Sequence, residues 1–153
     1  MTATDADRPR LRRPESVLVV VYTLAGEVLL LHRRHPVFWQ SVTGSLEHGE
    51  TAAQAAVREL AEETGLTGCD LIDCAHSYRF EIKPAWQHKY PVGVRYNTEH
   101  AFLCPLAERL PVTLSETEHS EYCWKPFKQA RDRVWSWSNR AALESFVAPK
   151  LGI

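Results

Sequence analysis

Three glutamates in one short stretch are the residues best suited to chemistry. Glu59, Glu62 and Glu63 stand three and four positions apart, so on an α-helix they share one face within about one turn. Carboxylates held side by side repel one another, and the C-terminal end of a helix also disfavours negative charge. A divalent cation reverses this repulsion, because Mg2+ prefers oxygen ligands and binds substrate phosphates as well. The stretch therefore predicts a magnesium site; a solvated acidic helix end paired with Arg58 is the alternative.

The residues around these glutamates predict a glycine-containing turn followed by a helix. Gly44 and Gly49 permit a tight loop beside a bound ion. Glu50 or Thr51 caps the helix, and Gly65 ends it in a left-handed conformation. The stripe that faces the core consists of Ala53, Ala56, Val57, Leu60 and Thr64. We therefore expect the carboxylates and the core stripe to occupy different sides of this helix.

A basic cluster lies between the first strands and the acidic helix. The β-branched runs 17–22 and 28–31 predict two strands joined by a turn, and a short apolar stretch, 39–42, leads to the glycine turn. Arg33 and Arg34 stand at the end of the second run, and the planar guanidinium suits phosphate. They are candidates for phosphate binding, with an exposed strand end as the alternative. Phe38 and Trp39 are expected in the core, or one of them stacks on a planar ligand ring.

The chain after the helix predicts further strands around one long loop. Segments 69–76, 77–82 and 99–104 read as extended, 105–111 as a turn or short helix, and 112–114 and 122–124 as short strands. The loop 85–98 mixes aromatic rings, cations and an amide, so it could recognise a heterocycle and phosphates, or simply face water. A final helix is expected near Trp135, with Ser138 as its N-cap.

Composition favours a single soluble domain. The chain has 153 residues and a net charge of −1, so it lacks a general basic field for nucleic acid. It has no apolar run of membrane-spanning length and no signal-peptide pattern, which predicts a cytoplasmic protein without membrane or nucleic-acid partners. Its four cysteines are expected to be reduced thiols. We expect residues 1–13 to form a flexible tail and residues 14–153 the domain.

The acidic stretch resembles the Nudix box. The pattern glycine, glutamate, arginine–glutamate, aliphatic, two glutamates, glycine, aliphatic is filled at Gly44, Glu50, Arg58, Glu59, Leu60, Glu62, Glu63, Gly65 and Leu66. The resemblance implies a Nudix-type α/β/α sandwich with a mixed sheet and a Mg2+ cofactor, for which Mn2+ is a possible substitute. It also implies hydrolysis of a phosphoanhydride in a small-molecule triphosphate.

A narrower resemblance extends from Pro14 to Val147. Segments 17–22, 38–45, 71–74, 97–99, 117–119 and 137–140 look like those of the dihydroneopterin triphosphate pyrophosphohydrolases of folate biosynthesis. Those enzymes cleave dihydroneopterin triphosphate to the monophosphate and pyrophosphate. Segments 77–90 and 123–134 match poorly, which leaves the pterin contacts open.

The resemblance also implies roles for individual residues. Glu59, Glu62 and Glu63 would bind the metal with the carbonyl of Gly44, while Glu118 would complete the site or act as base, with Glu116 and Glu121 as rivals. Glu62 is the other candidate base, Glu50 a supporting ligand, and Arg58 would orient a neighbouring glutamate. The expected substrate-binding residues are Arg33, Arg34, Trp39, Gln40, Lys89, Arg95 and Asn97.

Two other functions remain open at this point. The same metal centre would serve a nucleoside triphosphate or dinucleoside polyphosphate pyrophosphohydrolase. A third possibility is a Nudix domain that only binds a ligand, although a pure binding module has no need for mutually repulsive carboxylates.

Overall fold

A mixed β-sheet forms the centre of the protein. The computed structural model describes residues 11–35 and 37–153, and within them the sheet has seven strands. These are β1 (Glu15–Thr23), β2 (Glu27–Arg33), β3 (Phe38–Gln40), β4 (Val42–Ser45), β5 (Ile72–Glu81), β6 (Tyr96–Leu106) and β7 (His119–Pro126). β1 runs parallel to β6, and the other pairings are antiparallel.

The sheet divides beside β1. The start of β1 pairs with β4 over Ser16–Val19, whereas its end pairs with β2 at Tyr22 and Val28. β2 then carries β3 near its own end and β7 along its length. β4 and β3 are consecutive in the chain and yet pair with different strands, so a division opens between them.

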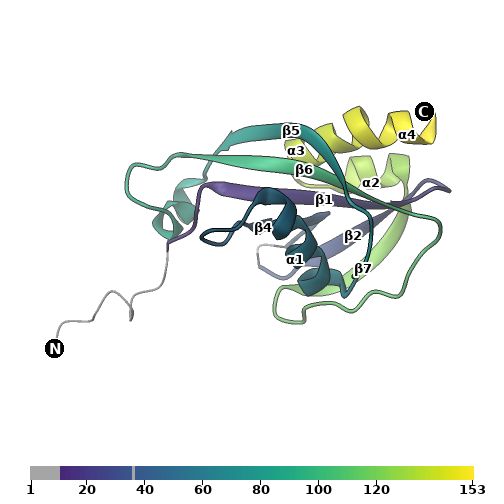
Figure 1. Ribbon diagram of the computed structural model, residues 1–153, viewed down its shortest axis with the longest axis horizontal. Helices are drawn as coiled ribbons and strands as arrows, with labels where there is room; N and C mark the ends of the chain where they lie inside the picture. Colours follow the sequence, from purple (N-terminus) through teal and green to yellow (C-terminus); the bar gives the residue numbers. More distant parts are fainter. Residues whose placement is uncertain (1–10, 36) are drawn as a thin grey trace.

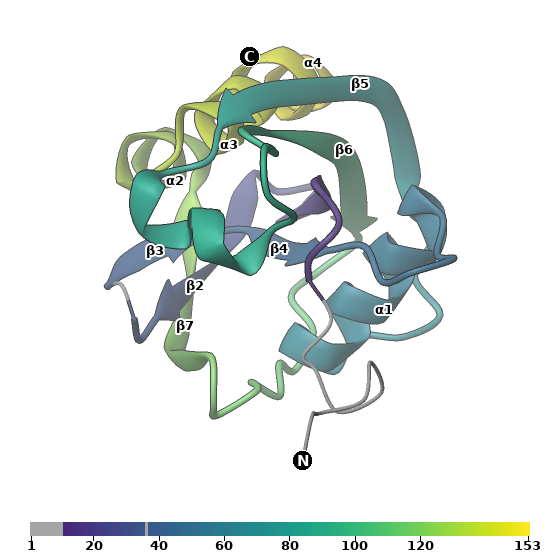
Figure 2. The same ribbon diagram turned by 90° about the vertical axis from the view of Figure 1, so that its left-hand side faces the viewer.

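Helices cover both faces of the sheet. Helix α1 (Ala52–Thr64) lies on one face, while α2 (Phe127–Arg133), α3 (Trp137–Ala142), the π-helical turn Leu143–Val147 and α4 (Ala148–Leu151) lie on the other (Figures 1 and 2). Two apolar clusters fill these layers, one beneath α1 and one beneath α2 to α4. Side chains alternate along a strand, so β1 contributes to both clusters. Val17, Val19 and Val21 pack on the α1 side, and Leu18 and Val20 pack on the other side. The predicted α/β/α sandwich is confirmed.

Helix α1 begins and ends where its sequence predicts, but its buried face is shifted. Thr51 is the N-cap, accepting from the Gln54 amide in a capping box, and Gly65 ends the helix at φ 74°. The predicted core stripe is wrong in part, because Ala53 and Val57 are exposed. The buried positions are Ala55, Ala56, Glu59, Leu60, Glu63 and Thr64. Two of the glutamates therefore share the buried face with the apolar residues.

Several boundaries after α1 also differ from expectation. β6 extends to Leu106, residues 112–114 form no strand, and β7 begins earlier than predicted, at His119. Helix α2 was not predicted, and Ser136, rather than Ser138, caps α3 by accepting from the Asn139 amide. A 3-10 helix, Pro84–Lys89, occupies part of the long loop. Among the described residues, no helix is both long and apolar enough to cross a membrane.

The predicted N-terminal tail is only partly described. Residues 1–10 lie outside the described residues. Arg13 already contacts the domain, because its guanidinium donates to the carbonyls of Glu47 and Glu50 and pairs with Glu15 at 3.0 Å. The Arg12 amide donates to the carbonyl of Lys89. Ordered contacts therefore begin before Pro14.

Candidate active site

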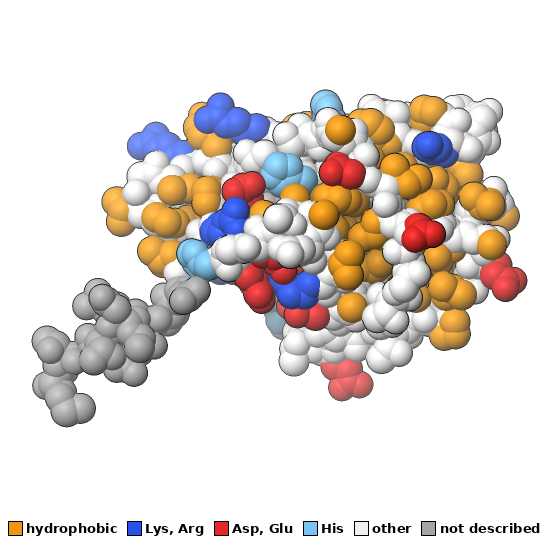
Figure 3. All heavy atoms as spheres, in the orientation of Figure 1, with side chains coloured by type: hydrophobic (Ala, Val, Ile, Leu, Met, Phe, Trp, Pro, Cys, Tyr) orange, Lys and Arg blue, Asp and Glu red, His pale blue; other side chains and the backbone are white. Residues whose placement is uncertain are grey.

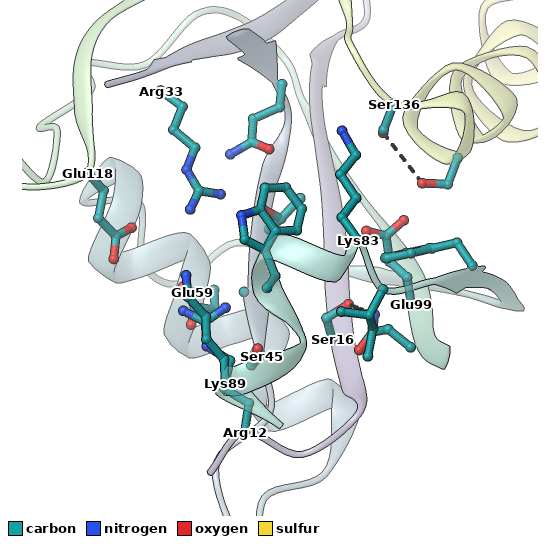
Figure 4. A pocket seen from close by; sticks show the side chains of 18 of the residues that line it. Arg12, Ser16, Arg33, Ser45, Glu59, Lys83, Lys89, Glu99, Glu118 and Ser136 are labelled. Carbon is teal, nitrogen blue, oxygen red and sulfur yellow. Dashed lines mark hydrogen bonds between the residues drawn. The ribbon is translucent and has the colours of Figure 1, made fainter. Parts of the chain in front are cut away.

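One large cavity lies where the sheet divides. Its volume is about 580 Å3, which is within the usual range for small-molecule sites. Its walls include residues of α1 from one face of the sheet and of α3 from the other, together with β1, β3, β4, β6 and the 3-10 helix. Figure 4 shows Glu59, Glu118 and Arg33 toward one end, and Ser16 and Glu99 toward the other. The two ends differ in chemistry.

Arg58 holds the acidic group of α1 together. Its guanidinium donates to both carboxylate oxygens of Glu50, at 2.7 and 2.8 Å, and to the carbonyl of Ser45 at 3.0 Å. One of its nitrogens, Nη1, also reaches Glu59 at 2.8 Å and Glu62 at 3.2 Å. Acidic and basic side chains consequently meet on the surface over α1 and β4 (Figure 3). Arg58 therefore holds Glu59 and Glu62 beside one another.

Burial makes ionisation of the two inner glutamates costly. Burial raises the pKa of Glu59 to about 7, although Arg58 acts in the opposite direction. The side chain of Glu63 is deeper, and burial, followed by the charge of Glu59 and the Glu118 carboxyl, holds its pKa well above its usual range. The Thr43 amide donates to Glu63 at 3.2 Å. A bound cation would compensate this concentration of buried carboxyl groups.

Gly44 allows Glu59 to reach the β4 backbone. A Cβ atom at position 44 would lie 2.1 Å from the Glu59 carboxyl carbon, a distance no side chain tolerates. Gly44 also lines the cavity, so its backbone stands beside the carboxylates. The site thus has the crowded oxygen donors that a hard divalent cation requires, and the residues present fit such an ion.

A second cluster comes from the loop before β7. Ligand atoms of Glu63, Glu118 and His119 all lie within 4.8 Å of one another. His119 is buried, neither of its ring nitrogens has a partner among the described residues, and burial lowers its pKa. Of the three glutamates considered for this loop, Glu118 lines the cavity, whereas Glu116 and Glu121 are outside its lining.

Basic residues border the same end of the cavity. Arg33 and Arg34 line it, as do Arg12 and Lys89, which are joined through a backbone hydrogen bond of 2.8 Å. Among the described residues, none of these four side chains has an ion pair with an acidic partner, so their charges remain available to an anion.

The structure does not bring every predicted site residue to the cavity. Gln40 and Asn97 line it, but Trp39 points to the opposite side of β3, where it packs on the α2-side core with its ring centroid 4.7 Å from His32. Arg95 is exposed outside the cavity lining. Glu62 also lies outside the lining, on the exposed flank of α1.

Sequence reasoning missed most of the far end of the cavity. Trp135, Trp137, Ser138, Lys83 and Glu99 line it without having been selected as site residues. The available signal was Glu99 alternating with Asn97 in a strand that continues into apolar residues. A charged residue on the buried face of such a strand requires an explanation.

Known proteins similar to this chain cover most of its length. Residues 12–146 match the family model described as the NUDIX domain. Dihydroneopterin triphosphate diphosphatase of Escherichia coli is 45% identical over 142 residues, covering 89% of this chain and 93% of that protein. The protein of the same name from Haemophilus influenzae is 40% identical and covers 87% of each chain.

A solved structure shows that the fold is shared with one of these relatives. The structure of the Escherichia coli dihydroneopterin triphosphate pyrophosphohydrolase superposes with a TM-score of 0.83 at 43% identity. The likeness covers 91% of this chain and 98% of that one.

Proposed function

The chain belongs to the Nudix family, and we propose that it is the pyrophosphohydrolase that converts dihydroneopterin triphosphate to dihydroneopterin monophosphate and pyrophosphate. The observation that carries this proposal is the 45% identity to a diphosphatase of that substrate, maintained over 89% of the chain. The cavity supports it, because its lining combines buried carboxyl groups, basic side chains and exposed tryptophan rings. This reaction is a step of folate biosynthesis, and we place the enzyme in the cytoplasm.

We propose Mg2+ as the cofactor, with Mn2+ as a substitute. Glu59, Glu62, Glu63 and the Gly44 carbonyl would hold the ion, which when bound neutralises phosphate oxygens and lowers the pKa of water. Glu62 can join this set because its carboxylate already shares Arg58 Nη1 with Glu59. The guanidinium of Arg58 keeps these two glutamates aligned and separate from the substrate phosphates.

The other residues divide the remaining work. Arg33, Arg34, Arg12 and Lys89 bind the negatively charged triphosphate and hold it in the cavity. Glu118 would accept the proton of the attacking water, with Glu62 as the other candidate base; the position of the Glu118 carboxyl beside Glu63 supports this role. Phosphoryl transfer requires mainly positioning and charge stabilisation from a protein, and this arrangement provides both.

Product identification tests this function. Purified protein with Mg2+ should turn over dihydroneopterin triphosphate faster than nucleoside triphosphates or diadenosine tetraphosphate, releasing pyrophosphate. Hydrolysis in oxygen-18 water, followed by mass spectrometry, identifies the phosphorus attacked. Faster turnover of a nucleotide would favour the alternative substrates, and absence of any metal-dependent pyrophosphate release would favour a binding domain.

A further inference from the structure

Two unpaired acceptor oxygens lie at the end of the cavity away from the α1 carboxylates. Asn97 and Glu99 on β6 are 2% and 6% exposed, and both line the cavity. Among the described residues, Asn97 Oδ1 and Glu99 Oε1 have no hydrogen-bond partner. Neither atom has a role in metal or phosphate binding as described above, so both can accept hydrogen bonds from a ligand in the cavity.

The strands fix both side chains on one side of the sheet. Residues two apart on a strand share a face, so Asn97 and Glu99 point the same way, and Ser16 on β1 stands opposite Glu99 in the parallel register. The Asn97 amide nitrogen donates to the Ser16 hydroxyl at 2.8 Å. This bond uses the donor side of the amide, so the oxygen is left as the free acceptor. Burial raises the pKa of Glu99, and a hydrogen bond with Ser138, from α3, opposes this only in part.

Such an arrangement is costly without a ligand. A buried acceptor that lacks a partner loses its hydration without compensation, and a buried carboxylate without a cation is worse. A sheet built only for stability would carry apolar residues here, as β6 does at Ala101 and Leu103 further along the same face. Two adjacent unpaired acceptors are complementary to two adjacent N–H donors.

Aromatic side chains flank these acceptors. Trp135 and Trp137 line the cavity and remain 40% and 57% exposed, which is unusual for such large rings. Trp135 stacks on Phe38 with a centroid distance of 4.3 Å and lies edge-on to Trp86 at 6.3 Å. The Lys83 ammonium lies 4.7 Å from the Trp135 centroid, so Trp135 borders this part of the cavity, and the more exposed Trp137 offers a face on which a flat heterocycle can stack.

We infer that Glu99 and Asn97 select the substrate by its heterocycle, accepting hydrogen bonds from an adjacent ring N–H and exocyclic amino group while the tryptophans cover the ring. This inference rests on the proposed function and deepens it. A 2-amino-4-oxo ring, as in pterin or guanine, has this donor pair. Adenine and hypoxanthine do not, because adenine presents an acceptor next to its amino group and hypoxanthine lacks the 2-amino group.

Steady-state kinetics of Glu99→Gln test the inference. The amide keeps the shape of the side chain but places an NH2 group or a weaker acceptor where a carboxylate stood. We expect KM for dihydroneopterin triphosphate to rise about ten- to hundredfold with kcat changed less than about threefold, because the contact is distant from the reacting phosphates. Glu99→Asp keeps the negative charge but moves the carboxylate away from the ligand by one methylene group, so it should give an intermediate KM. Glu108→Gln, an exposed change outside the cavity, is the matched control.

A matched pair of nucleotides isolates the amino group. GTP and ITP differ only in the 2-amino group, so the native enzyme should prefer GTP about tenfold or more in kcat/KM, and Glu99→Gln should bring the ratio close to one. Equal use of GTP and ITP by the native enzyme, or a KM unchanged in Glu99→Gln, would overturn the inference.

Binding without hydrolysis separates this inference from the proposed function. Neopterin carries the same donor pair and no phosphate, and its fluorescence reports binding directly. If the protein binds neopterin, and Glu99→Gln weakens this binding about tenfold or more, the recognition site stands even where the triphosphate is not cleaved. If the triphosphate is cleaved and Glu99→Gln leaves neopterin affinity unchanged, the function stands and the recognition site is wrong.

Discussion

At the scale of single residues, the buried carboxyl of Glu63 is the most exacting part of the site. Glu63 is 3% exposed, accepts a hydrogen bond from the Thr43 amide and lies beside Glu118. A neutral side chain at this position would not supply the negative charge that attracts a cation. We expect Glu63→Gln to lower kcat/KM by about a hundredfold or more, since such ligand losses remove metal-assisted catalysis, while the protein remains folded. Glu62→Gln should also lose activity, although by less, because Glu62 begins on the exposed flank.

Pyrophosphate release and circular dichroism measure these two variants. Glu121→Gln, which removes an exposed carboxyl outside the cavity lining, is the control for charge alone. Near-normal turnover in Glu63→Gln would remove this residue from the mechanism.

Gly44 gives a second prediction at this scale, and it concerns space. A methyl group at position 44 would overlap the Glu59 carboxyl, so Gly44→Ala must displace that side chain and should reduce turnover strongly. Gly68→Ala provides the opposite case, because its φ of 70° is strained for alanine but nothing lies within 4 Å. That variant should lose about 1 kcal/mol of stability and keep its activity. Thermal unfolding and kinetics of both variants check the contrast, which would fail if both lost only stability.

The same scale shows how far the sequence predicted the site. The spacing of Glu59 and Glu63 was enough to predict that they share one face of α1, because helical geometry is local, but Glu62 lies on the exposed flank outside the cavity lining. Trp39 packs against the core, which was one of its two predicted positions, and does not line the cavity, since which side of a three-residue strand faces the cavity depends on its partner strand. Glu99 was missed because its surroundings include Ser138 of α3, a residue about forty positions further along the chain.

At the scale of elements, helix α1 positions the acidic group, and its first turn is fixed by side chains. Thr51 accepts from the Gln54 amide at 3.2 Å and the Gln54 side chain accepts from Thr51 at 2.9 Å, so both bonds of a capping box form. We expect Thr51→Ala to lower the free energy of unfolding by about 1 kcal/mol, the usual value of an N-cap. Chemical denaturation measures the change, and Thr67→Ala, an exposed threonine beyond the helix, is the control. An unchanged midpoint would show that tertiary packing alone holds this end.

The ends of α1 were predictable and its orientation was not. Caps are local signals, so Gly65 was identified from sequence and the N-cap was narrowed to Glu50 or Thr51, of which the structure has Thr51. The buried face was displaced by about one position, because Glu59 and Glu63 point toward the sheet, contrary to hydrophobic patterning. Helix α1 departs from the hydrophobic pattern and also forms the site, as expected where functional residues are kept at a cost in stability.

At the scale of the whole molecule, the two apolar layers must tolerate several buried acids. We expect a divalent cation to stabilise the fold, since it binds the native arrangement and relieves repulsion that the unfolded chain does not have. With free Mg2+ about a hundredfold above its dissociation constant, the gain is about 2.7 kcal/mol. The corresponding rise in Tm is about 5–10 °C for a domain of this size. Differential scanning calorimetry with EDTA as the metal-free reference measures the shift, and Glu63→Gln should lose most of it. A full shift in that variant would place the ion elsewhere.

Glu99 contributes one part of the pH dependence of stability, beside Glu59 and Glu63. Burial raises its pKa from 4.5 to about 6, with Ser138 opposing, and no cation contributes among the described residues. The folded state therefore holds the proton more tightly than the unfolded state, so stability falls as pH rises between about 4.5 and 6. The full difference is about 2 kcal/mol, because a tenfold change in proton affinity corresponds to about 1.4 kcal/mol.

Glu99→Gln removes this titration while leaving those of Glu59 and Glu63 in place. Compared with the native protein, its free energy of unfolding should therefore improve by about 2 kcal/mol between about pH 4 and pH 7.5, measured by urea denaturation in the presence of EDTA. Glu108→Gln, at an exposed site, should run parallel to the native curve. A parallel curve for Glu99→Gln would mean that its carboxyl is hydrated in solution. If Glu99→Gln gains stability over the native protein with rising pH and also recognises the substrate less well, then the native protein is less stable at neutral pH because it keeps this carboxylate for the ligand.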